Sequence, residues 1–320
     1  IKENPDLYIG IELEFPIVNL QGGATDTRVT RELLVRLNSD YGFIVERRDS
    51  EGNPIQLKAS DSEDRILFEV SYNILEFAFE KDPEGTVPDF DLPSIKTDLK
   101  NLDPSEDVMV WFGHSSLFIQ ISGKKILVDP VFSKYASPVP FTNKAFKGTN
   151  IYDVDDLPEI DILLITHDHY DHLDYPTIKK LKNKVAKIIV PLGVDAHLLR
   201  WGYDEDKITT VDWDDEVVID DNLKIYALEA RHFSGRSFFN RNQSLWVSYL
   251  IEEKINNKNY KLFLSGDGGY SGRFKEFKER FLNIDFAAME SGQYNKEWSL
   301  IHSKPEDVIM ASQDMEIKNY

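Results

Sequence analysis

The stretch Thr166–His167–Asp168–His169–Tyr170–Asp171–His172 decides the fold of this chain. It follows residues 161–165 (DILLI), an apolar run that predicts a buried strand, so the stretch is expected on a strand-to-loop turn. Three His and two Asp within six residues would leave several polar groups unpaired if they were buried without a cation. Because imidazole nitrogen and carboxylate oxygen suit zinc or a similar divalent ion, the stretch predicts a metal site.

The composition limits the other possibilities. The chain has 320 residues, 41% of them hydrophobic, which is enough to bury a core in one large domain or two smaller ones. It carries 37 Lys and Arg against 56 Asp and Glu, a net charge of −19, which argues against nucleic acid as a partner because phosphate binding needs clustered cations. It contains no cysteine, so any metal must be held by His, Asp and Glu.

The chain shows no targeting or membrane-spanning signal. Residues 1–5 lack a basic segment followed by an apolar one, and no stretch reaches the roughly 18 apolar residues that span a bilayer. We therefore expect a cytoplasmic protein with at most peripheral membrane contact, of unknown oligomeric state. Because residue 1 is Ile, we expect the chain to start inside a longer reading frame or after processing.

Hydrophobic periodicity predicts two sheets covered by outer helices in the part of the chain after residue 93. The predicted strands are 108–110, 117–121, 125–128, 160–166, 185–191, 216–219, 223–230, 245–252, 261–264 and 284–289. The predicted helices are 176–181, 196–201, 274–281 and 305–314.

Four further stretches extend the metal motif along the chain. They are residues 111–116 (WFGHSS), 126–132 (ILVDPVF), 230–232 (ARH) and 265–270 (SGDGGY). With the H-x-H-x-D-H motif they resemble the metallo-β-lactamase fold superfamily, and within it the branch of N-acylphosphatidylethanolamine-hydrolysing phospholipase D. A more distant similarity is to L-ascorbate-6-phosphate lactonase. The resemblance covers about residues 94–320 and implies an α+β fold, a four-layer αββα sandwich.

The resemblance also implies two metal ions, expected to be zinc, with manganese or iron as alternatives. The first ion would be held by His167, His169 and His232, the second by Asp171 and His172, and Asp267 would bridge both. A hydroxide between the ions would be the nucleophile. The resemblance makes Asp171 and His302 the catalytic residues: Asp171 would orient the hydroxide, and His302 would bind phosphate or protonate the leaving group.

One ligand of the resembled family is expected to be missing. The family's second metal takes another His from a last strand, which would start where this chain reads residues 315–320 (MEIKNY). We therefore expect a second site that is one ligand short, weakened occupancy of the second metal and low activity. An inactive binding scaffold is an alternative.

The substrate is expected to be a phosphodiester, either a small molecule or a lipid, with a small phosphorylated lactone-type substrate as the alternative. The candidate substrate-binding residues are His114, Arg231, Arg236 and Tyr294. Both arginines could hold phosphate or form salt bridges on the acidic surface. His114 could support the metal ligands without binding the metal, or it could have a structural role. The apolar insertion at residues 133–141, with Phe146, could form a lipid entrance or pack as an ordinary loop.

The N-terminal part carries a different pattern. In the predicted strand at residues 7–18, alternation places Glu12 and Glu14 on one face, as Mg²⁺ binding requires, although a solvent-facing edge strand would look the same. Residues 10–15 (GIELEF) resemble the first strand motif of the glutamate–cysteine ligase family, whose acidic pair holds Mg²⁺, and residues 68–77 (FEVSYNILEF) add to the likeness. Residues 5–80 therefore resemble a fragment of that family, and a ligase-type fragment is a third hypothesis. An accessory module that binds a partner would also fit.

Residues 81–93 contain three prolines and four acids and predict a linker. The expected organisation is therefore a small partial α+β domain at residues 1–80, the linker, and a C-terminally truncated hydrolase domain at residues 94–320.

Overall fold

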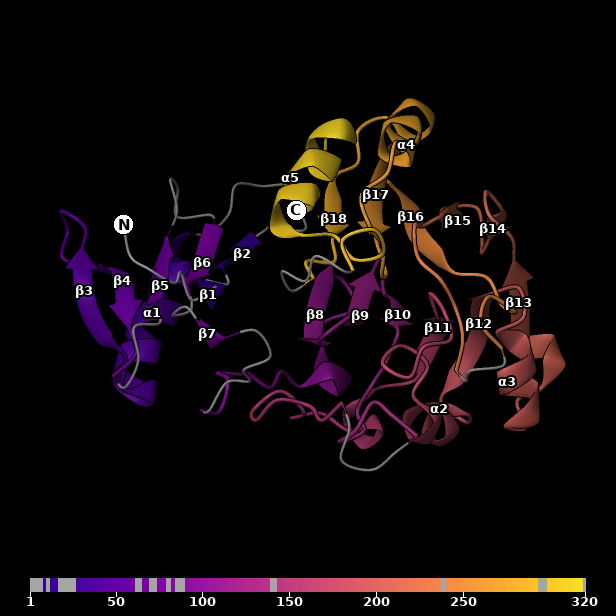
Figure 1. The fold of residues 1–320 in the computed structure, drawn as a ribbon, viewed down its shortest axis with the longest axis horizontal. Coiled ribbons are helices and arrows are strands. Elements are labelled where there is room, and N and C mark those ends of the chain that lie inside the picture. The colour runs from indigo at the N-terminus through magenta and orange to yellow at the C-terminus, as the bar shows by residue number, and fades with distance from the viewer. Residues whose placement is uncertain are drawn as a thin grey trace, which may run out of the picture. The chain divides into compact units, whose positions relative to one another are not determined.

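The computed structural model describes ten ranges of the chain (Figure 1). These are residues 8–9, 12–16, 27–60, 65–68, 74–78, 82–83, 90–138, 143–236, 240–292 and 298–318. The described residues up to Pro83 belong to one compact unit and those from Phe90 to Lys318 to a second. The division into residues 1–80, 81–93 and 94–320, with its partial and truncated domains, stays a prediction.

The first unit is an antiparallel five-stranded sheet of order β2-β6-β5-β4-β3 with one helix. Its elements are β2 (Glu12–Pro16), α1 (Thr27–Tyr41), β3 (Ile44–Arg48), β4 (Pro54–Lys58), β5 (Arg65–Phe68) and β6 (Ile74–Ala78), and a separate pair joins β1 (Tyr8–Ile9) to β7 (Asp82–Pro83). Leu34 and Leu37 of α1 pack against Leu57 of β4.

The predicted acidic pair falls in β2, where Glu12 and Glu14 pair with Ala78 and Glu76 of β6. The side chains of both glutamates lie outside the described part of the structure. Their Mg²⁺ role and the ligase resemblance therefore stay predictions.

The second unit contains two sheets. The six-stranded sheet has the order β13-β12-β11-β10-β9-β8, from β8 (Val108–Gly113), β9 (Ser116–Ile121), β10 (Lys124–Val128), β11 (Ile160–Leu164), β12 (Val185–Pro191) and β13 (Ile208–Val211). The five-stranded sheet has the order β14-β15-β16-β17-β18, from β14 (Glu216–Val218), β15 (Leu223–Glu229), β16 (Val247–Ile255), β17 (Lys258–Leu264) and β18 (Phe286–Ala288).

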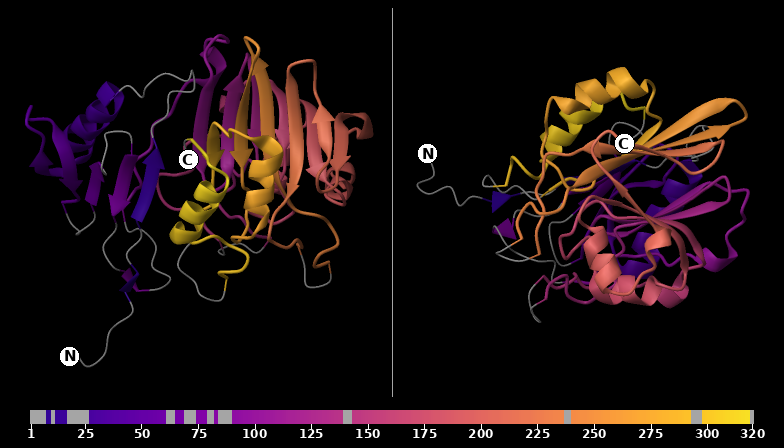
Figure 2. Two further views of the ribbon diagram at one scale, coloured as in Figure 1. Left: turned by 90° about the horizontal axis from the view of Figure 1, so that it is seen from above. Right: turned by 90° about the vertical axis from the view of Figure 1, so that its right-hand side faces the viewer.

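Helices cover the outer face of each sheet, so the unit has the predicted order αββα (Figure 2, right). The helices are α2 (Tyr175–Leu181), α3 (Asp195–Arg200), α4 (Arg273–Phe281) and α5 (Pro305–Asp314), with short 3₁₀ turns at Leu99–Asn101, Val154–Asp156 and Glu205–Lys207. The expectation of an α+β, metallo-β-lactamase-like sandwich is confirmed for this unit.

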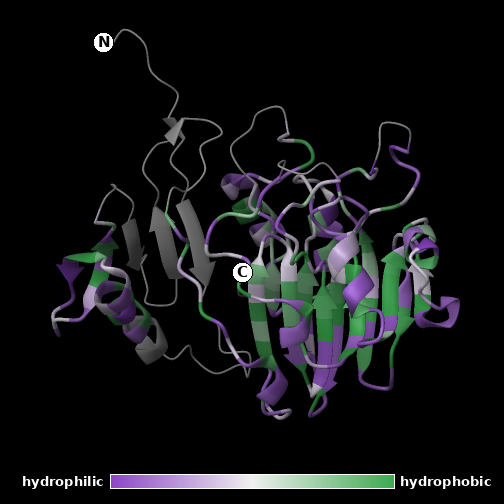
Figure 3. Cartoon of the chain, turned by 90° about the horizontal axis from the view of Figure 1, so that it is seen from below, coloured by the Kyte–Doolittle hydropathy of each residue, from purple (hydrophilic) through white to green (hydrophobic). Residues whose placement is uncertain are grey.

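Alternation along the central strands produces the layers. In β11, Ile162 and Leu164 belong to the core between the two sheets, whereas Leu163 packs with Ile178 of α2. Such strands are apolar on both faces because both faces are covered, and Figure 3 shows hydrophobic residues recurring along them. Among the residues that the structure describes, no helix is both long and apolar enough to cross a bilayer.

Pairing brings several strand ends to one edge of the sandwich. β10 and β11 are parallel, so residues that follow Val128 and Leu164 emerge side by side. β15 and β17 both run antiparallel to β16, and β18 runs parallel to β17, so these three strands also end together. The β8–β9 turn lies at the same edge, since Leu117 pairs with Val128.

Candidate metal centre

Backbone hydrogen bonds hold the strand-end loops of the two sheets together. Val247 N–H donates to Thr166 O at 3.0 Å, which ties the motif loop of the first sheet to β16 of the second. Gly269 N–H donates to Arg231 O at 3.0 Å and joins the loops after β15 and β17. The predicted ligands from both sheets therefore meet at this edge.

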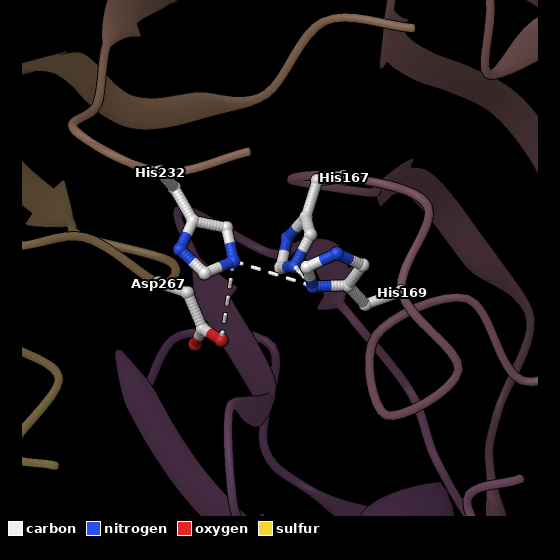
Figure 4. A group of neighbouring side chains, drawn as sticks. All are labelled: His167, His169, His232 and Asp267. Atoms are coloured by element: carbon white, nitrogen blue, oxygen red, sulfur yellow. Dashed lines mark hydrogen bonds and ion pairs between the residues drawn. The ribbon is translucent and has the colours of Figure 1, made fainter. Parts of the chain in front are cut away.

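The first cluster consists of His167, His169, His232 and Asp267 (Figure 4). His169 Nδ1 lies 2.8 Å from His167 Nε2 and 3.2 Å from His232 Nε2, and Asp267 Oδ2 lies 3.8 Å from His232 Nε2. Ligand atoms about 2.1 Å from a tetrahedral cation are about 3.4 Å apart, so these spacings suit a divalent ion. The four residues predicted around the first metal are brought together.

Hydrogen bonds fix the orientation of two of these imidazoles. His232 Nδ1 lies 2.8 Å from Ile301 O and donates to it, and His167 Nδ1 lies 3.0 Å from Thr166 Oγ1. In each ring the nitrogen that is not used this way, Nε2, points at the cluster. Such partners orient metal-binding histidines and set their tautomer.

The electrostatics keep the three histidines of the first cluster neutral. Burial lowers the pKa of His167 well below its usual value, lowers that of His169, and lowers that of His232 to about 4. At neutral pH these rings therefore present lone pairs, as a metal ligand must.

The second cluster consists of His114, Asp171 and His172. His172 is completely buried, with its Nδ1 2.8 Å from Asp129 Oδ2. Its other nitrogen, Nε2, lies 3.1 Å from Asp267 Oδ1, an ion-pair distance, but it is buried without a hydrogen-bond partner. An unpaired buried nitrogen beside a carboxylate fits a cation ligand. Burial lowers the pKa of His172, but Asp267 and Asp129 outweigh that effect and raise it well above the usual value, so this position favours positive charge.

Asp267 faces both clusters. Its Oδ1 lies toward His172 and its Oδ2 toward His232. Burial raises the pKa of Asp267, but His172 outweighs burial, so the carboxyl stays ionised. The preceding Gly266 has φ +57°, and a Cβ there would lie 2.9 Å from the Thr166 side chain, so only glycine fits this approach of the two loops.

Asp129 supports the second cluster, a role that the sequence analysis did not assign. Its Oδ1 accepts from Thr166 N–H at 2.8 Å, and its Oδ2 accepts from Thr166 Oγ1 at 2.5 Å as well as from His172. The available signal was an Asp directly after a predicted strand, at the edge where the ligands gather.

Glu290 was also not identified from the sequence. Its Oε1 accepts a short hydrogen bond from His302 Nδ1, and its Oε2 accepts from Gly268 N–H at 2.7 Å. Burial raises the pKa of Glu290 to about 7; burial lowers the pKa of His302, but Glu290 raises it further, so it lies above its usual value. With Nδ1 engaged, Nε2 is the His302 nitrogen left for a ligand. Glu290 follows the end of β18 as Asp267 follows the end of β17. This shared position after a strand is the sequence signal that could have identified Glu290 as a residue of the centre.

The candidate substrate-binding residues have different surroundings. Arg236 Nη1 donates to Asp168 O at 2.8 Å and Leu173 O at 2.7 Å, and its guanidinium stacks 4.0 Å from the Tyr170 ring centre, so it braces the motif loop. Arg231 is exposed and donates to Tyr270 O at 3.0 Å. Tyr294 lies outside the described residues. Phosphate contacts of these residues stay predictions.

The proposed lipid entrance is described only in part. Phe146 is exposed, whereas Phe141 lies outside the described residues. His197 of α3 is partly exposed, with its Nε2 3.5 Å from Asp168 Oδ2.

Comparison with known proteins agrees with this geometry. Residues 124–320 match the beta-lactamase superfamily domain. An uncharacterized protein of Mycobacterium tuberculosis is 35% identical over 225 residues, 70% of this chain and 59% of that protein. The mitochondrial N-acyl-phosphatidylethanolamine-hydrolyzing phospholipase D of Saccharomyces cerevisiae is 32% identical over 222 residues, 65% of this chain and 45% of that protein.

Among solved structures, CmlA, a diiron β-hydroxylase from Streptomyces venezuelae, is 21% identical with a TM-score of 0.48, covering 68% of this chain and 45% of that chain. The curated relatives are matched over only about half of their length, but the domain match spans more than half of this chain. The predicted similarity to the phospholipase D branch is confirmed, and the chain belongs to the beta-lactamase superfamily, with the fold of its metal-dependent members.

Proposed function

We propose that the chain is a metal-dependent hydrolase that cleaves a phosphodiester at a two-zinc centre. The observation that carries the proposal is the shared carboxylate: Asp267 presents one oxygen to each of two ligand clusters. A pair of divalent cations held there would lower the pKa of a water molecule toward neutrality and neutralise charge on the phosphoryl oxygens.

Three further side chains have roles in the proposed reaction. Asp171, about a third exposed, can accept a hydrogen bond from the attacking water and orient it. His302, held through Nδ1 by Glu290, can donate from Nε2 to a phosphoryl oxygen or to the leaving group. Asp129 fixes His172 and so positions the second cluster.

The phosphodiester class is supported by similarity to the yeast enzyme, whose name describes hydrolysis of N-acyl-phosphatidylethanolamine. A small or lipid phosphodiester is therefore the proposed substrate, and nucleic acid is not, because the net charge is −19. A cytoplasmic location with at most peripheral membrane contact stays a prediction. The lactone-type substrate, the binding scaffold and the ligase-type fragment remain the alternatives.

The test is hydrolysis of bis(p-nitrophenyl) phosphate by protein whose metal content is measured in parallel. Asp267→Ala and His169→Ala should each lower the rate by more than about 100-fold, because each removes a ligand of the centre. His197→Ala is the matched control and should keep the rate within about twofold. Protein that binds two metals but cleaves no diester would refute this function and favour the scaffold.

Metal content and alternative substrates complete the test. Elemental analysis of protein purified without added metal separates zinc from manganese and iron. Cleavage of a phosphorylated lactone without cleavage of any diester would favour the alternative substrate class. If Phe146→Asp leaves partitioning onto N-acylphosphatidylethanolamine vesicles unchanged, the lipid-entrance idea fails.

A further inference from the structure

We infer that His114 is a ligand of the second cation, which it would hold together with Asp171 and His172. This inference rests on the proposed two-ion centre and deepens it. The resemblance places His114 among substrate or supporting residues, whereas the geometry places it in a ligand set.

The ligand atoms of the second cluster have the spacing expected around a cation. One ligand atom from each of His114, Asp171 and His172 lies within 4.8 Å of the other two. His114 Nε2 lies 3.4 Å from Asp171 Oδ2, close to the separation of about 3.4 Å expected for two ligands about 2.1 Å from a tetrahedral cation. Its ring packs edge-on to that of His172, with the centres 5.1 Å apart.

The buried Nε2 of His172 also points to a cation. A surface His–Asp pair forms without any further group and adds little to stability. Here the third member, His172, is completely buried, and its Nε2 lies 3.1 Å from Asp267 Oδ1 without a hydrogen bond to any described residue. A cation bound at Nε2 explains both the His114–Asp171 pair and the buried nitrogen that faces a carboxylate without a hydrogen bond, whereas a surface ion pair explains only the first.

The backbone at His114 adopts an uncommon conformation. This residue has φ +49°, a left-handed conformation that is unfavourable for a non-glycine residue, and it follows Gly113 at φ +106°. The Trp111 indole N–H donates to His114 O at 2.6 Å, which holds the turn in place. The β8–β9 turn therefore presents His114 in a fixed, strained conformation at the edge where the other ligands gather.

The environment of His114 predicts how its cation behaves. The side chains of His114 and Asp171 are 50% and 36% exposed, whereas His172 is fully buried. Water can therefore compete with two of the three ligands for the cation. This cation should bind more weakly than the one in the first cluster.

The test is metal binding, measured independently of hydrolysis. Apo protein is titrated with Co²⁺, followed by its visible absorption, and metal retained after equilibrium dialysis against Zn²⁺ is counted. Wild type should bind two equivalents. His114→Ala and His114→Asn should keep the first and weaken the second by at least about tenfold. Asn is included because it tolerates positive φ well but offers no imidazole nitrogen.

His197→Ala is the matched control, because it removes a partly exposed histidine that also lies 3.5 Å from a carboxylate but belongs to neither cluster. It should bind two equivalents as wild type does. Unchanged affinity for the second equivalent in both His114 variants would overturn the inference. So would binding of a single equivalent by wild type, or loss of both equivalents from a variant that melts like wild type.

Diester hydrolysis by the same samples separates this inference from the proposed function. If the protein hydrolyses the diester but binds the second metal equivalent equally well without His114, only the inference about His114 is refuted. Two equivalents with the expected dependence on His114, but no hydrolysis of any diester, refute only the proposed substrate chemistry.

Discussion

The two ligand clusters differ in how far the protein fixes them before a metal binds. In the first cluster, His167, His232 and Asp267 are buried, and the Nδ1 atoms of both histidines have polar partners. In the second, His172 alone is buried and anchored, while His114 and Asp171 lie at the rim. We therefore expect one tightly held cation and one exchangeable cation at a single centre.

The largest effect is expected at the residue that the clusters share. Asp267→Asn keeps the shape of the side chain but removes the negative charge that faces both clusters. Both metal equivalents should be lost at micromolar metal, and diester hydrolysis should fall more than about 1,000-fold. Retention of either equivalent at wild-type affinity would show that Asp267 does not bridge.

The next test asks whether the clusters are independent. His169→Ala removes the ring whose Nδ1 lies between His167 and His232. The tight equivalent should be lost and hydrolysis abolished, while the weaker one should persist within about threefold in Co²⁺ titration, because it uses other side chains. Loss of both equivalents would mean that the clusters form one cooperative site.

A smaller effect is expected from the support of the second cluster. Asp129→Asn replaces the acceptor that holds His172 Nδ1 and should weaken the second equivalent by about 10–100-fold while leaving the first unchanged. The melting temperature of the apo protein is the control for the buried hydrogen bonds to Thr166. Equal weakening of both equivalents would contradict the separation of the two clusters.

A change beside the clusters should affect catalysis without affecting metal content. Glu290→Gln removes the charge that accepts from His302 and should lower kcat by about tenfold, with KM within about twofold and both equivalents retained. Loss of a metal equivalent instead would make Glu290 a ligand.

The smallest effect is expected far from the centre. Glu253 lies on β16, six residues beyond Val247, so about 20 Å farther along the strand, and its Oε2 is buried without a hydrogen-bond partner. Burial raises the pKa of Glu253, so the folded state holds the proton more tightly than the unfolded chain does, and stability is lost as pH rises through the folded pKa.

Glu253→Gln should therefore stabilise the protein by about 1 kcal/mol at pH 7. The gain should vanish below the unfolded pKa of about 4.3, and metal binding should not change. Urea unfolding at pH 4 and pH 7 measures the difference, and a gain that is the same at both values would contradict the assignment to this carboxyl.

The layers of the second unit follow from apolar periodicity, and most of its strands were predictable from the sequence. Strand β13 was not predicted, because its residues Ile208–Val211 include two threonines at the edge of the sheet. Strand β17 begins at residue 258 rather than at the predicted 261, because Lys258 and Asn259 are polar and become strand only by pairing with Ile255 and Lys254. Pairing partners, not local composition, decide such ends.

The centre was predictable where its residues form a contiguous motif or follow a buried strand. The grouping of His114 with Asp171 was not, because the two are 57 residues apart and meet only through the β8–β9 turn and the pairing of β9, β10 and β11. Asp129 and Glu290 follow strand ends, which is a local signal for their location, but their partners His172 and His302 are set by hydrogen bonds across the fold.

The segment around Ile301 links two parts of the centre mechanically. The carbonyl of Ile301 accepts from His232, and the next residue is His302, which Glu290 holds on the other side. A substrate that displaced His302 would pull on the carbonyl that sets the tilt of His232. Displacement of His302 would then reach the first cluster through the single peptide unit that joins Ile301 to His302. The affinity of the first cluster for its cation should therefore change when substrate binds.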